Sequence, residues 1–571
     1  MSRYLPKSIV CFREGYTSKK FTGDLLAGLT VAVIALPLAM AFGIASIPKE
    51  VADAVGMSPP AMGLFTAVVA GFLISALGGS RVQIGGPTGA FIVIVYRIAT
   101  EHGYAGLATA TLMAGVIVII MGLARFGGMI KFIPYPVTTG FTTGIAVIIF
   151  VGQLRDFFGL EVESVPPDLV HKCQVFVEHA ATWQSATLAV GAGSLAALIL
   201  LRRLVPRIPG AIVVVTLSAA VVWLFGLPVE TIGSRFGQVP SMLPAPHLPS
   251  FSYELARELI PEATTIAILV AIESLLSAVV ADGMIGGRHK ANCELVAQGI
   301  ANMASVVFGG IPATGAIART AANVKSGGRT PLAGMVHALA LLAFMAVLAP
   351  LAARIPLAAL AAVLMIVAWN MSELGHFRAL LRAPLSDIAV LLTTFGLTVL
   401  TDLTIAVGVG IVLASLLFMK RMADVSNVGA IARELNGEDD EVDRRDVEAL
   451  AEVRLLPGIE LYEINGPFFF GVADRLKDTL SSLERPPVVF ILRMRKVPAI
   501  DATGLHALEE LYYKCHRQGT RLVLSGVHAQ PLSVFYKTGF AKVIGEQNMF
   551  PNLEAALIGA VDQIERAPVI N

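Results

Sequence analysis

Two short stretches interrupt the most hydrophobic part of this chain, and both have the residue types of an anion site. The first is GGPTGAF, from Gly85 to Phe91, and the second is GGIPATGAIARTAAN, from Gly309 to Asn323. Glycine and proline mark helix boundaries, and the first turn of a helix offers free N–H groups and a partial positive charge. Two helix starts at such breaks would therefore bind a small anion.

The prolines indicate where these helices are expected to begin. Pro87 and Pro312 suit a first helical position, where the missing N–H would have no partner anyway, and the glycines before them permit an unusual backbone path. The two breaks fall seven predicted spans apart, so the second copy enters the membrane in the opposite orientation, as in transporters built from inverted repeats. The alternative interpretation is that these glycines and prolines only allow close helix packing.

Two ionisable residues lie within predicted spans. Arg319 follows the second break on the same short helix, about two turns in, and would supply a fixed positive charge for an anion. Alternatively, its side chain reaches the cytoplasmic surface or pairs with Glu273. Glu273, in ILVAIESLLSAVVADG, can carry a proton because a buried carboxyl group favours its neutral form. Alternatively, Glu273 is only a structural partner of Arg319 or of nearby hydroxyls, and the sequence does not distinguish the two roles.

Composition places these residues in a bilayer. The chain has 571 residues, of which 55% are hydrophobic and 15% charged, and its mean hydropathy is +0.72. These values exclude an ordinary soluble globule, and a net charge of +1 gives no field for nucleic acid. The sequence has no cluster of metal-ligand spacing, no phosphate-binding loop and no Ser-His-Asp pattern. We therefore expect no cofactor, no metal and no enzyme activity.

Apolar runs of spanning length predict about fourteen membrane helices, some of them short for a full crossing. Lysines and arginines gather in alternate loops, which predicts cytoplasmic N- and C-termini and an acidic outer loop after Phe157. The N-terminus lacks the pattern of a cleaved signal peptide, so the first span is expected to direct insertion. The runs are approximately 24–43, 61–78, 87–100, 105–124, 136–157, 182–201, 209–225, 259–281, 294–308, 313–326, 331–349, 355–371, 386–401 and 403–419.

Four parts are predicted along the chain. They are a cytoplasmic N-terminal segment (1–22), a transmembrane transport domain (23–421), a charged linker (422–450) and a soluble α/β domain (451–565). The last part alternates short β-like runs with helical ones, which is typical of a mainly parallel sheet. It is long enough to bury its own core.

The chain resembles the sulfate permease (SulP) family of anion transporters, which carry a C-terminal STAS domain. The resemblance rests on GGPTGAF, GRHKANCELVAQGIANMASVVFGGIPATGAIARTAANVKSGGRTP, LMIVAWNMSE and PAIDATGLHALEEL. Within the family, IARTAANVKSG, VAWNMSE and VGIVLASLLFM resemble the DauA-type C4-dicarboxylate transporters, and Leu38 stands where many sulfate transporters have glutamine. The resemblance implies a seven-plus-seven inverted repeat with core and gate domains, an elevator-like movement and a homodimer in the bacterial inner membrane.

The resemblance also implies site residues. The substrate would lie between the helix starts, against Thr88, Gly89, Ala90 and Phe91 on one side and Ala316, Ile317, Ala318 and Arg319 on the other. Glu273 matches a coupling-ion position, for H+ or, in bicarbonate transporters, Na+. In the STAS domain, the loop DATG places Asp501 and Thr503 where related soluble domains are phosphorylated. Alternatively, this loop caps a helix or contacts a protein partner, such as acyl carrier protein.

Together these observations predict a secondary active transporter, with proton-coupled uptake of C4-dicarboxylates such as succinate, fumarate and aspartate. One alternative is a sulfate or bicarbonate transporter of the same family. Another is a membrane-anchored sensor that signals anion binding through the STAS domain. A nucleobase permease shares the architecture, but Arg319 and the STAS domain count against it.

Overall fold

The computed structural model describes the chain in segments separated by short gaps. These segments are residues 4–128, 134–162, 165–166, 168–205, 210–238, 240–249, 252–401, 403–425, 427–430, 458–469 and 486–566. The chain divides into two compact units, Met1–Ala414 and Ser415–Asn571. Most of the predicted charged linker, residues 431–450, lies outside the described residues, as does the start of the predicted C-terminal domain.

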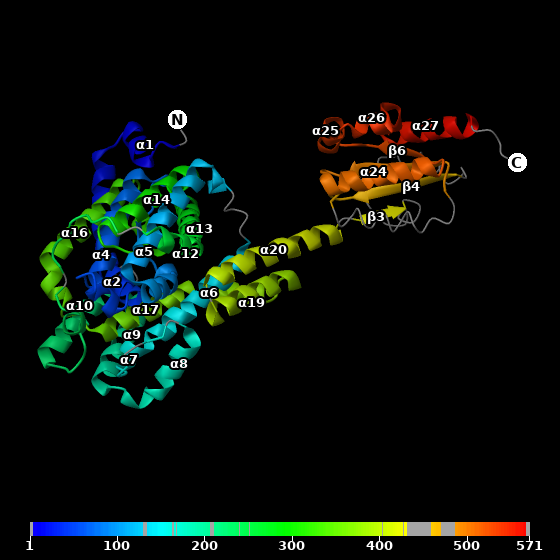
Figure 1. Ribbon diagram of the computed structural model, residues 1–571. Coiled ribbons are helices and arrows are strands. Elements are labelled where there is room, and N and C mark those ends of the chain that lie inside the picture. The colour runs from blue at the N-terminus through cyan, green and yellow to red at the C-terminus, as the bar shows by residue number, and fades with distance from the viewer. Residues whose placement is uncertain are drawn as a thin grey trace. The chain divides into compact units, whose positions relative to one another are not determined.

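The first unit is built from long apolar helices (Figure 1). Nine helical segments of the described part are long and apolar enough to cross a membrane. They contain α2 (Ser18–Ser46), α4 (Pro59–Leu77), α5 (Ile92–Leu123), α6 (Tyr135–Gly152), α9 (Ser185–Leu204), α13 (Ile260–Ile285), α16 (Leu332–Ala352), α17 (Leu357–Met371) and α20 (Leu403–Val425). Shorter apolar helices are α10 (Gly210–Phe225), α14 (Ala291–Val307), α15 (Ile317–Lys325) and α19 (Leu385–Leu400). Connecting helices are α1 (Lys7–Arg13), α3 (Lys49–Asp53), α7 (Leu154–Phe158), α8 (Leu169–Glu178), α11 (Ile232–Phe236), α12 (Tyr253–Glu258) and α18 (Leu374–Leu380).

Each apolar run predicted from the sequence falls on one of these helices. The runs 87–100 and 105–124 share α5, which Gly103 breaks because its φ of 66° cannot continue a right-handed helix. The helix α2 begins at Ser18, within the predicted N-terminal segment, and α20 continues past residue 421 to Val425. The number of membrane crossings stays a prediction.

The helices of the first unit pack as two bundles. In the first bundle, α2 packs on α4 and α16, and α5 packs on α13 and α14. In the second bundle, α6 packs on α17 and α19, and α9 packs on α10 and α17. Contacts between the bundles are fewer and join mainly α2 to α10 and α17, and α5 to α6. This division agrees with the core and gate parts that the family resemblance implies.

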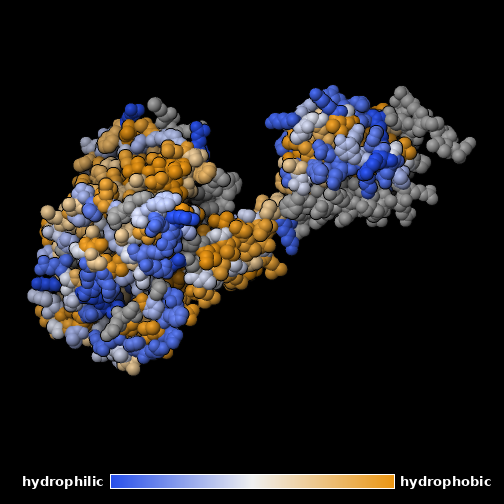
Figure 2. Space-filling view, viewed as in Figure 1, coloured by the Kyte–Doolittle hydropathy of each residue, from blue (hydrophilic) through white to orange (hydrophobic). Residues whose placement is uncertain are grey.

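The outer surface of the helices is hydrophobic. Figure 2 shows an almost continuous apolar surface over α19 and α20. Leu400 on α19 and Val412 on α20 are exposed, as expected for side chains that face lipid. A helix pairs its own backbone groups, so only its side chains need to suit the hydrocarbon.

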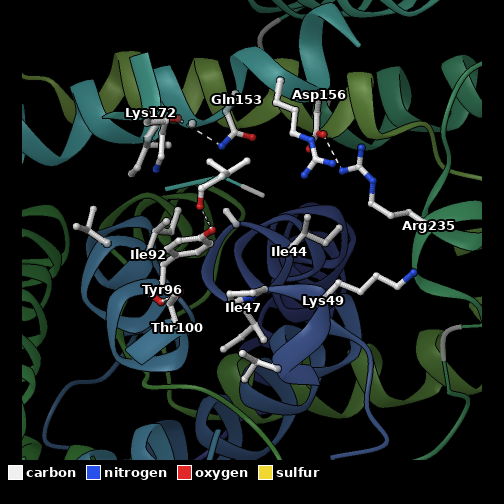
Figure 3. Close-up of a pocket in the computed structure, with 18 of the residues that line it drawn as sticks. Ile44, Ile47, Lys49, Ile92, Tyr96, Thr100, Gln153, Asp156, Lys172 and Arg235 are labelled. Carbon is white, nitrogen blue, oxygen red and sulfur yellow. Dashed lines mark hydrogen bonds and ion pairs between the residues drawn. The ribbon is translucent and has the colours of Figure 1, made fainter. Parts of the chain in front are cut away.

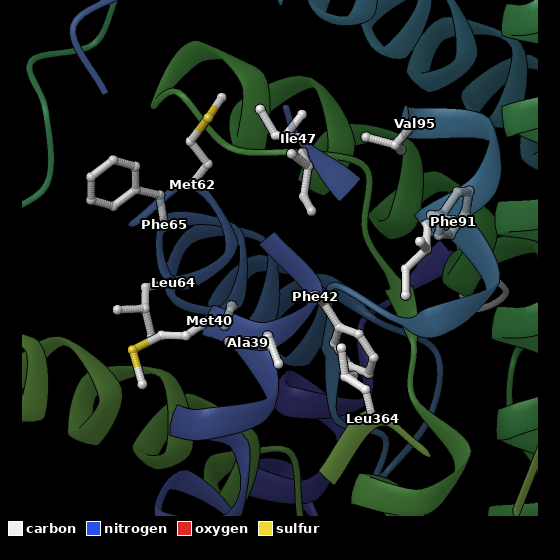
Figure 4. Close-up of a cluster of buried hydrophobic side chains, with 14 of the residues drawn as sticks. Ala39, Met40, Phe42, Ile47, Met62, Leu64, Phe65, Phe91, Val95 and Leu364 are labelled. Atoms are coloured by element: carbon white, nitrogen blue, oxygen red, sulfur yellow. The ribbon is translucent and has the colours of Figure 1, made fainter. Parts of the chain in front are cut away.

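Close packing in the first bundle depends on small residues. Gly63 of α4 lies against α2 so closely that a Cβ atom there would be 1.9 Å from the carbonyl oxygen of Ala39. Around this contact, Met40, Met62 and Phe65 are fully buried (Figure 4). The two helices therefore pack backbone to backbone, as small residues allow in membrane helices.

Two buried carboxylates that the sequence analysis did not single out hold loops against this bundle. Asp24 of α2 accepts hydrogen bonds from the backbone N–H groups of Arg329 (2.7 Å) and Thr330 (3.1 Å). Glu294 of α14 accepts from the N–H groups of Gly79 (2.7 Å) and Ser80 (3.1 Å). Both carboxylates are fully buried. Each satisfies backbone donors that would otherwise be unpaired, which is costly in a low dielectric.

The second unit contains an α/β sheet. Its five strands are β3 (Asn427–Ala430), β4 (Ile459–Asn465), β5 (Val489–Lys496), β6 (Arg521–Ser525) and β7 (Met549–Phe550). β3 pairs antiparallel with β4, and β4, β5, β6 and β7 are parallel neighbours in that order. The α-helices of its described residues after β5 are α24 (Ala502–Arg517), α25 (Ala529–Thr538), α26 (Phe540–Ile544) and α27 (Leu553–Arg566). The predicted helical membrane domain followed by a mainly parallel α/β domain is confirmed.

A cysteine offers a direct test of the predicted orientation. Cys173 on α8 is exposed, whereas Cys11, Cys293 and Cys515 are buried. Because α8 follows the predicted outer loop, a membrane-impermeant thiol reagent should label Cys173 in intact cells. The Cys173→Ser variant is the control and should remain unlabelled. Labelling that requires disruption of the membrane would reverse the predicted orientation.

Candidate anion site

The two breaks found in the sequence lie side by side in the structure. Strand β1 (Gly85–Gly86) pairs antiparallel with β2 (Thr314–Gly315), with Gly86 opposite Thr314. The Ala316 N–H also donates to the carbonyl oxygen of Ile84, at 2.8 Å. Antiparallel pairing is the relation expected of two oppositely oriented copies of one break. It also supplies backbone partners that an extended segment inside a membrane needs.

Side chains complete this backbone pairing at the second break. The Asn302 amide on α14 donates from Nδ2 to the Ala313 carbonyl and accepts at Oδ1 from the Ala313 N–H, both at 2.8 Å. Thr66 of α4 accepts from the Ile311 N–H at 2.7 Å. The Ser274 hydroxyl on α13 lies 2.6 Å from Thr314 Oγ1. Sequence reasoning missed these residues, because a single polar residue within an apolar helix gives no sign of its tertiary partner.

Both helix starts lie a few residues after the positions predicted from proline. The first is the short 3-10 helix η2 (Gly89–Phe91), which leads into α5, and the second is α15, whose N-cap is Ala316. Pro87 and Pro312 therefore precede the helices instead of opening them. At the second break, Thr314 and Gly315 are extended because they form β2. At the first break, β1 precedes Pro87, and Thr88 is the extended N-cap of η2.

The residues expected to contact substrate differ in exposure. Ala90 and Phe91 are 1% exposed and pack into the core, and Gly89 and Ala316 are also buried. Ile317 is half-buried and Ala318 is exposed at the start of α15. Thr88 is half-buried, but its Oγ1 atom is buried and has no hydrogen-bond partner. Thr88 and the start of α15 therefore offer free groups at the crossing, whereas Phe91 contributes packing.

Arg319 joins the two breaks. It is the third residue of α15, so it lies in the first turn and not two turns in, and its side chain is buried. The Nη2 atom donates to the carbonyl oxygen of Pro87, and Nη1 is buried without a partner. Gly86, with φ of 144°, leaves room for this guanidinium, since a Cβ there would lie 2.8 Å from Nη1. One donor of Arg319 therefore fixes the crossing and another remains free for an anion.

Glu273 lies near the crossing without an ion-pair partner. It is half-buried on α13, one residue before Ser274, which contacts the second break. Among the described residues, no ion pair joins Glu273 to Arg319. Glu273 and Arg319 therefore do not pair with each other in this conformation.

The first helix start faces the second bundle. A Cβ atom on Gly89 would lie 2.9 Å from Sδ of Met371 on α17 and 3.2 Å from Cδ1 of Ile149 on α6. The end of α17 is held to α6 by a hydrogen bond from Thr143 Oγ1 to the Ser372 carbonyl, at 2.7 Å. The candidate site therefore lies at the junction of the two bundles.

Comparison with known proteins agrees with this geometry. The sequence profile of the sulfate permease family matches residues 21–394, and that of the STAS domain matches residues 451–556. The chain belongs to the sulfate permease family. YvdB of Bacillus subtilis, whose name proposes sulfate transport, is 39% identical over 539 residues, which are 94% of this chain and 97% of YvdB.

Solved structures of two other proteins resemble this chain. The transmembrane domain of a cyanobacterium bicarbonate transporter, BicA, matches with 31% identity and a TM-score of 0.59, over 70% of this chain and 98% of that one. The murine anion transporter Slc26a9 matches with a TM-score of 0.83 over 98% of this chain and 94% of its own. Its identity of 20% bears on the fold alone. The prediction of a multi-pass membrane transporter that is not an enzyme agrees with these relatives.

The STAS domain of this chain presents the predicted DATG loop at the start of α24. Asp501 is the N-cap, and its carboxylate accepts a hydrogen bond from the Gly504 N–H at 2.8 Å. Thr503 is exposed in the first turn. The helix-cap interpretation therefore describes Asp501, and phosphorylation of Thr503 stays a prediction.

Proposed function

We propose that this member of the sulfate permease family carries a small oxyanion across the membrane, with sulfate and bicarbonate as the leading candidates. The observation that carries the proposal is the pair of unsatisfied groups at the crossing, Arg319 Nη1 and Thr88 Oγ1. A buried donor without a partner is costly, and an anion would offset that cost. The names of YvdB and BicA support the two candidates.

C4-dicarboxylate uptake, the main prediction from the sequence, is the second candidate. It rests on the resemblance of IARTAANVKSG, VAWNMSE and VGIVLASLLFM and on Leu38, and none of the relatives above is named for a dicarboxylate. One guanidinium donor and one hydroxyl suit a single small oxyanion. A dicarboxylate would need further groups for its second carboxylate.

Uptake into proteoliposomes tests the proposal. Radiolabelled sulfate and radiolabelled bicarbonate should each accumulate in the vesicles. Unlabelled sulfate, bicarbonate and succinate should reduce this uptake to different degrees. Accumulation of succinate with no competition from sulfate or bicarbonate would replace the leading candidates with the second. Binding of an anion without accumulation of any would favour the sensor interpretation.

We further propose that the first bundle moves past the second by an elevator-like displacement. Both helix starts belong to the first bundle, whereas Ile149 and Met371, which face Gly89, belong to the second. A homodimer and a protein partner of the STAS domain, such as acyl carrier protein, stay predictions of the sequence resemblance.

Glu273→Gln tests the proposed coupling role. We expect uptake by the native protein to be accelerated by an inward H+ gradient or an inward Na+ gradient, and Glu273→Gln to lose this acceleration while exchange of labelled for unlabelled anion continues. The reason is that glutamine cannot take up a proton or balance a cation. Glu262→Gln is a matched control on the same helix, because Glu262 lies in the first turn of α13, 3.5 Å from Arg97, whereas Glu273 lies in the middle of the helix. Full gradient stimulation in Glu273→Gln would remove this residue from coupling.

A further inference from the structure

A second polar cavity lies between the two bundles, near the predicted outer surface. Its volume is about 520 Å³. Figure 3 shows Ile92 and Tyr96 of α5 on one wall and Gln153, Asp156 and Lys172 on the wall across from them. Helices α2, α3 and α5 of the first bundle therefore face α6, α7, α8 and α11 across this space.

The charges that line the cavity do not cancel. Arg235 of α11 forms ion pairs with Asp156, at 2.7 Å, and with Glu230. These pairs engage two of the three carboxylates that line the cavity; the third, Glu50, is exposed. Lys172 and Arg155 form no ion pair with any carboxylate of the described residues. Two cationic side chains of the cavity lining therefore form no direct ion pair, although Asp156 and Glu230 lie near Arg155 and Asp168 lies near Lys172.

Lys172 is unusual for a lysine. The residue is only 7% exposed. Its ammonium lies over the ring of Tyr96, with Nζ 5.4 Å from the ring centroid. Burial lowers the pKa of the Lys172 ammonium, because the charged form is less well solvated there. Arg155 is half-buried, but its Nε atom is buried and has no hydrogen-bond partner in the described part of the chain. Buried cations of this kind are normally paired.

The cavity ends at residues that cover the central site. Ile92 and Val93, which line it, directly follow Phe91 at the first helix start. Ile149 lines the cavity and also faces Gly89, where a Cβ atom would lie 3.2 Å from Cδ1. A layer of apolar side chains therefore separates the outer cavity from the crossing of the two breaks.

We propose that this cavity is a second anion-binding site, in which Lys172 and Arg155 hold a small oxyanion on the outer side of the central site. The site extends the proposed function, since an anion held here is one side-chain layer from the helix starts. The cavity concentrates the anion near the site between movements of the bundles, as cationic clefts do for charged ligands. The aromatic contact of Lys172 keeps the ammonium in place while the cavity is empty.

Binding of radiolabelled sulfate to the purified full-length protein tests this proposal. In the Arg319→Gln variant, which lacks the central guanidinium, we expect sulfate binding to persist. Adding Lys172→Met should weaken that binding about tenfold or more, because a charge-assisted contact is lost. Adding Lys172→Arg, which keeps the charge, should preserve it. Lys49→Met is the matched control, since Lys49 lines the same cavity but is exposed.

The outcomes separate this site from the proposed function. Loss of all sulfate binding in Arg319→Gln, or unchanged binding after Lys172→Met, would overturn the outer site while leaving the uptake results intact. Equal losses in Lys172→Met and Lys172→Arg, in protein that stays monodisperse, would also overturn it. Binding that depends on Lys172 in a protein that transports no anion would retain the outer site and reject the proposed function.

Discussion

Arg319→Gln is expected to reduce anion uptake by about 30-fold or more while the protein stays folded. Removing one partner of a buried, hydrogen-bonded charge pair costs roughly 2–5 kcal/mol, and each factor of ten in rate corresponds to about 1.4 kcal/mol. The fold should tolerate the change because Nη1 has no protein partner and only the bond to the Pro87 carbonyl is lost. Uptake of labelled sulfate into proteoliposomes, at equal protein density, measures the effect.

A thermal stability measurement separates lost binding from lost folding. The native protein should melt at a higher temperature when sulfate is added, because a ligand stabilises the state that binds it. Arg319→Gln should lose the part of this shift that the central site contributes. Arg202→Gln is the matched control, since Arg202 is exposed and bonded to Asn370. Arg319→Gln with native uptake would remove this residue from the site.

The positions of the two breaks could be predicted from sequence because glycine and proline act locally. Gly85, Gly86 and Gly315 mark the interruptions, and Arg319 is conspicuous as a charge within an apolar run. The start of each helix was less predictable. Pro87 and Pro312 suit a first helical position, but the pairing of β1 with β2 places Pro87 directly after a strand and keeps Thr314 and Gly315 extended after Pro312. That pairing joins segments more than 200 residues apart, which local propensity does not encode.

The side chains that support the site could not be identified from sequence, because their partners lie in other segments of the chain. Asn302, Thr66 and Ser274 each stand alone in an apolar helix, and only the assembled bundle brings them to the second break. Lys172 has the sequence context of a solvated residue on a short outer helix. Its burial arises because α8 packs beside α6 while the Lys172 ammonium lies over the Tyr96 ring of α5, so the outer cavity depends on contacts between the bundles. Sequence pattern therefore located the helix starts but not what surrounds them.

Asn302→Leu is expected to lower the free energy of unfolding by roughly 2–6 kcal/mol, because two buried backbone groups would lose their partners at about 1–3 kcal/mol each. The Ala313 N–H and carbonyl each bond to the Asn302 amide at 2.8 Å, and leucine offers neither donor nor acceptor. No water is available inside a bilayer to replace them.

Denaturant unfolding in detergent micelles measures this change, with Asn370→Leu as the matched control. Asn370 is exposed and bonds to the exposed Arg202, so its substitution should change the free energy of unfolding by less than about 0.5 kcal/mol. An Asn302→Leu protein as stable as this control would show that other groups satisfy the second break. An unstable variant whose residual folded fraction still binds sulfate would show instead that Asn302 supports the break without contacting the anion.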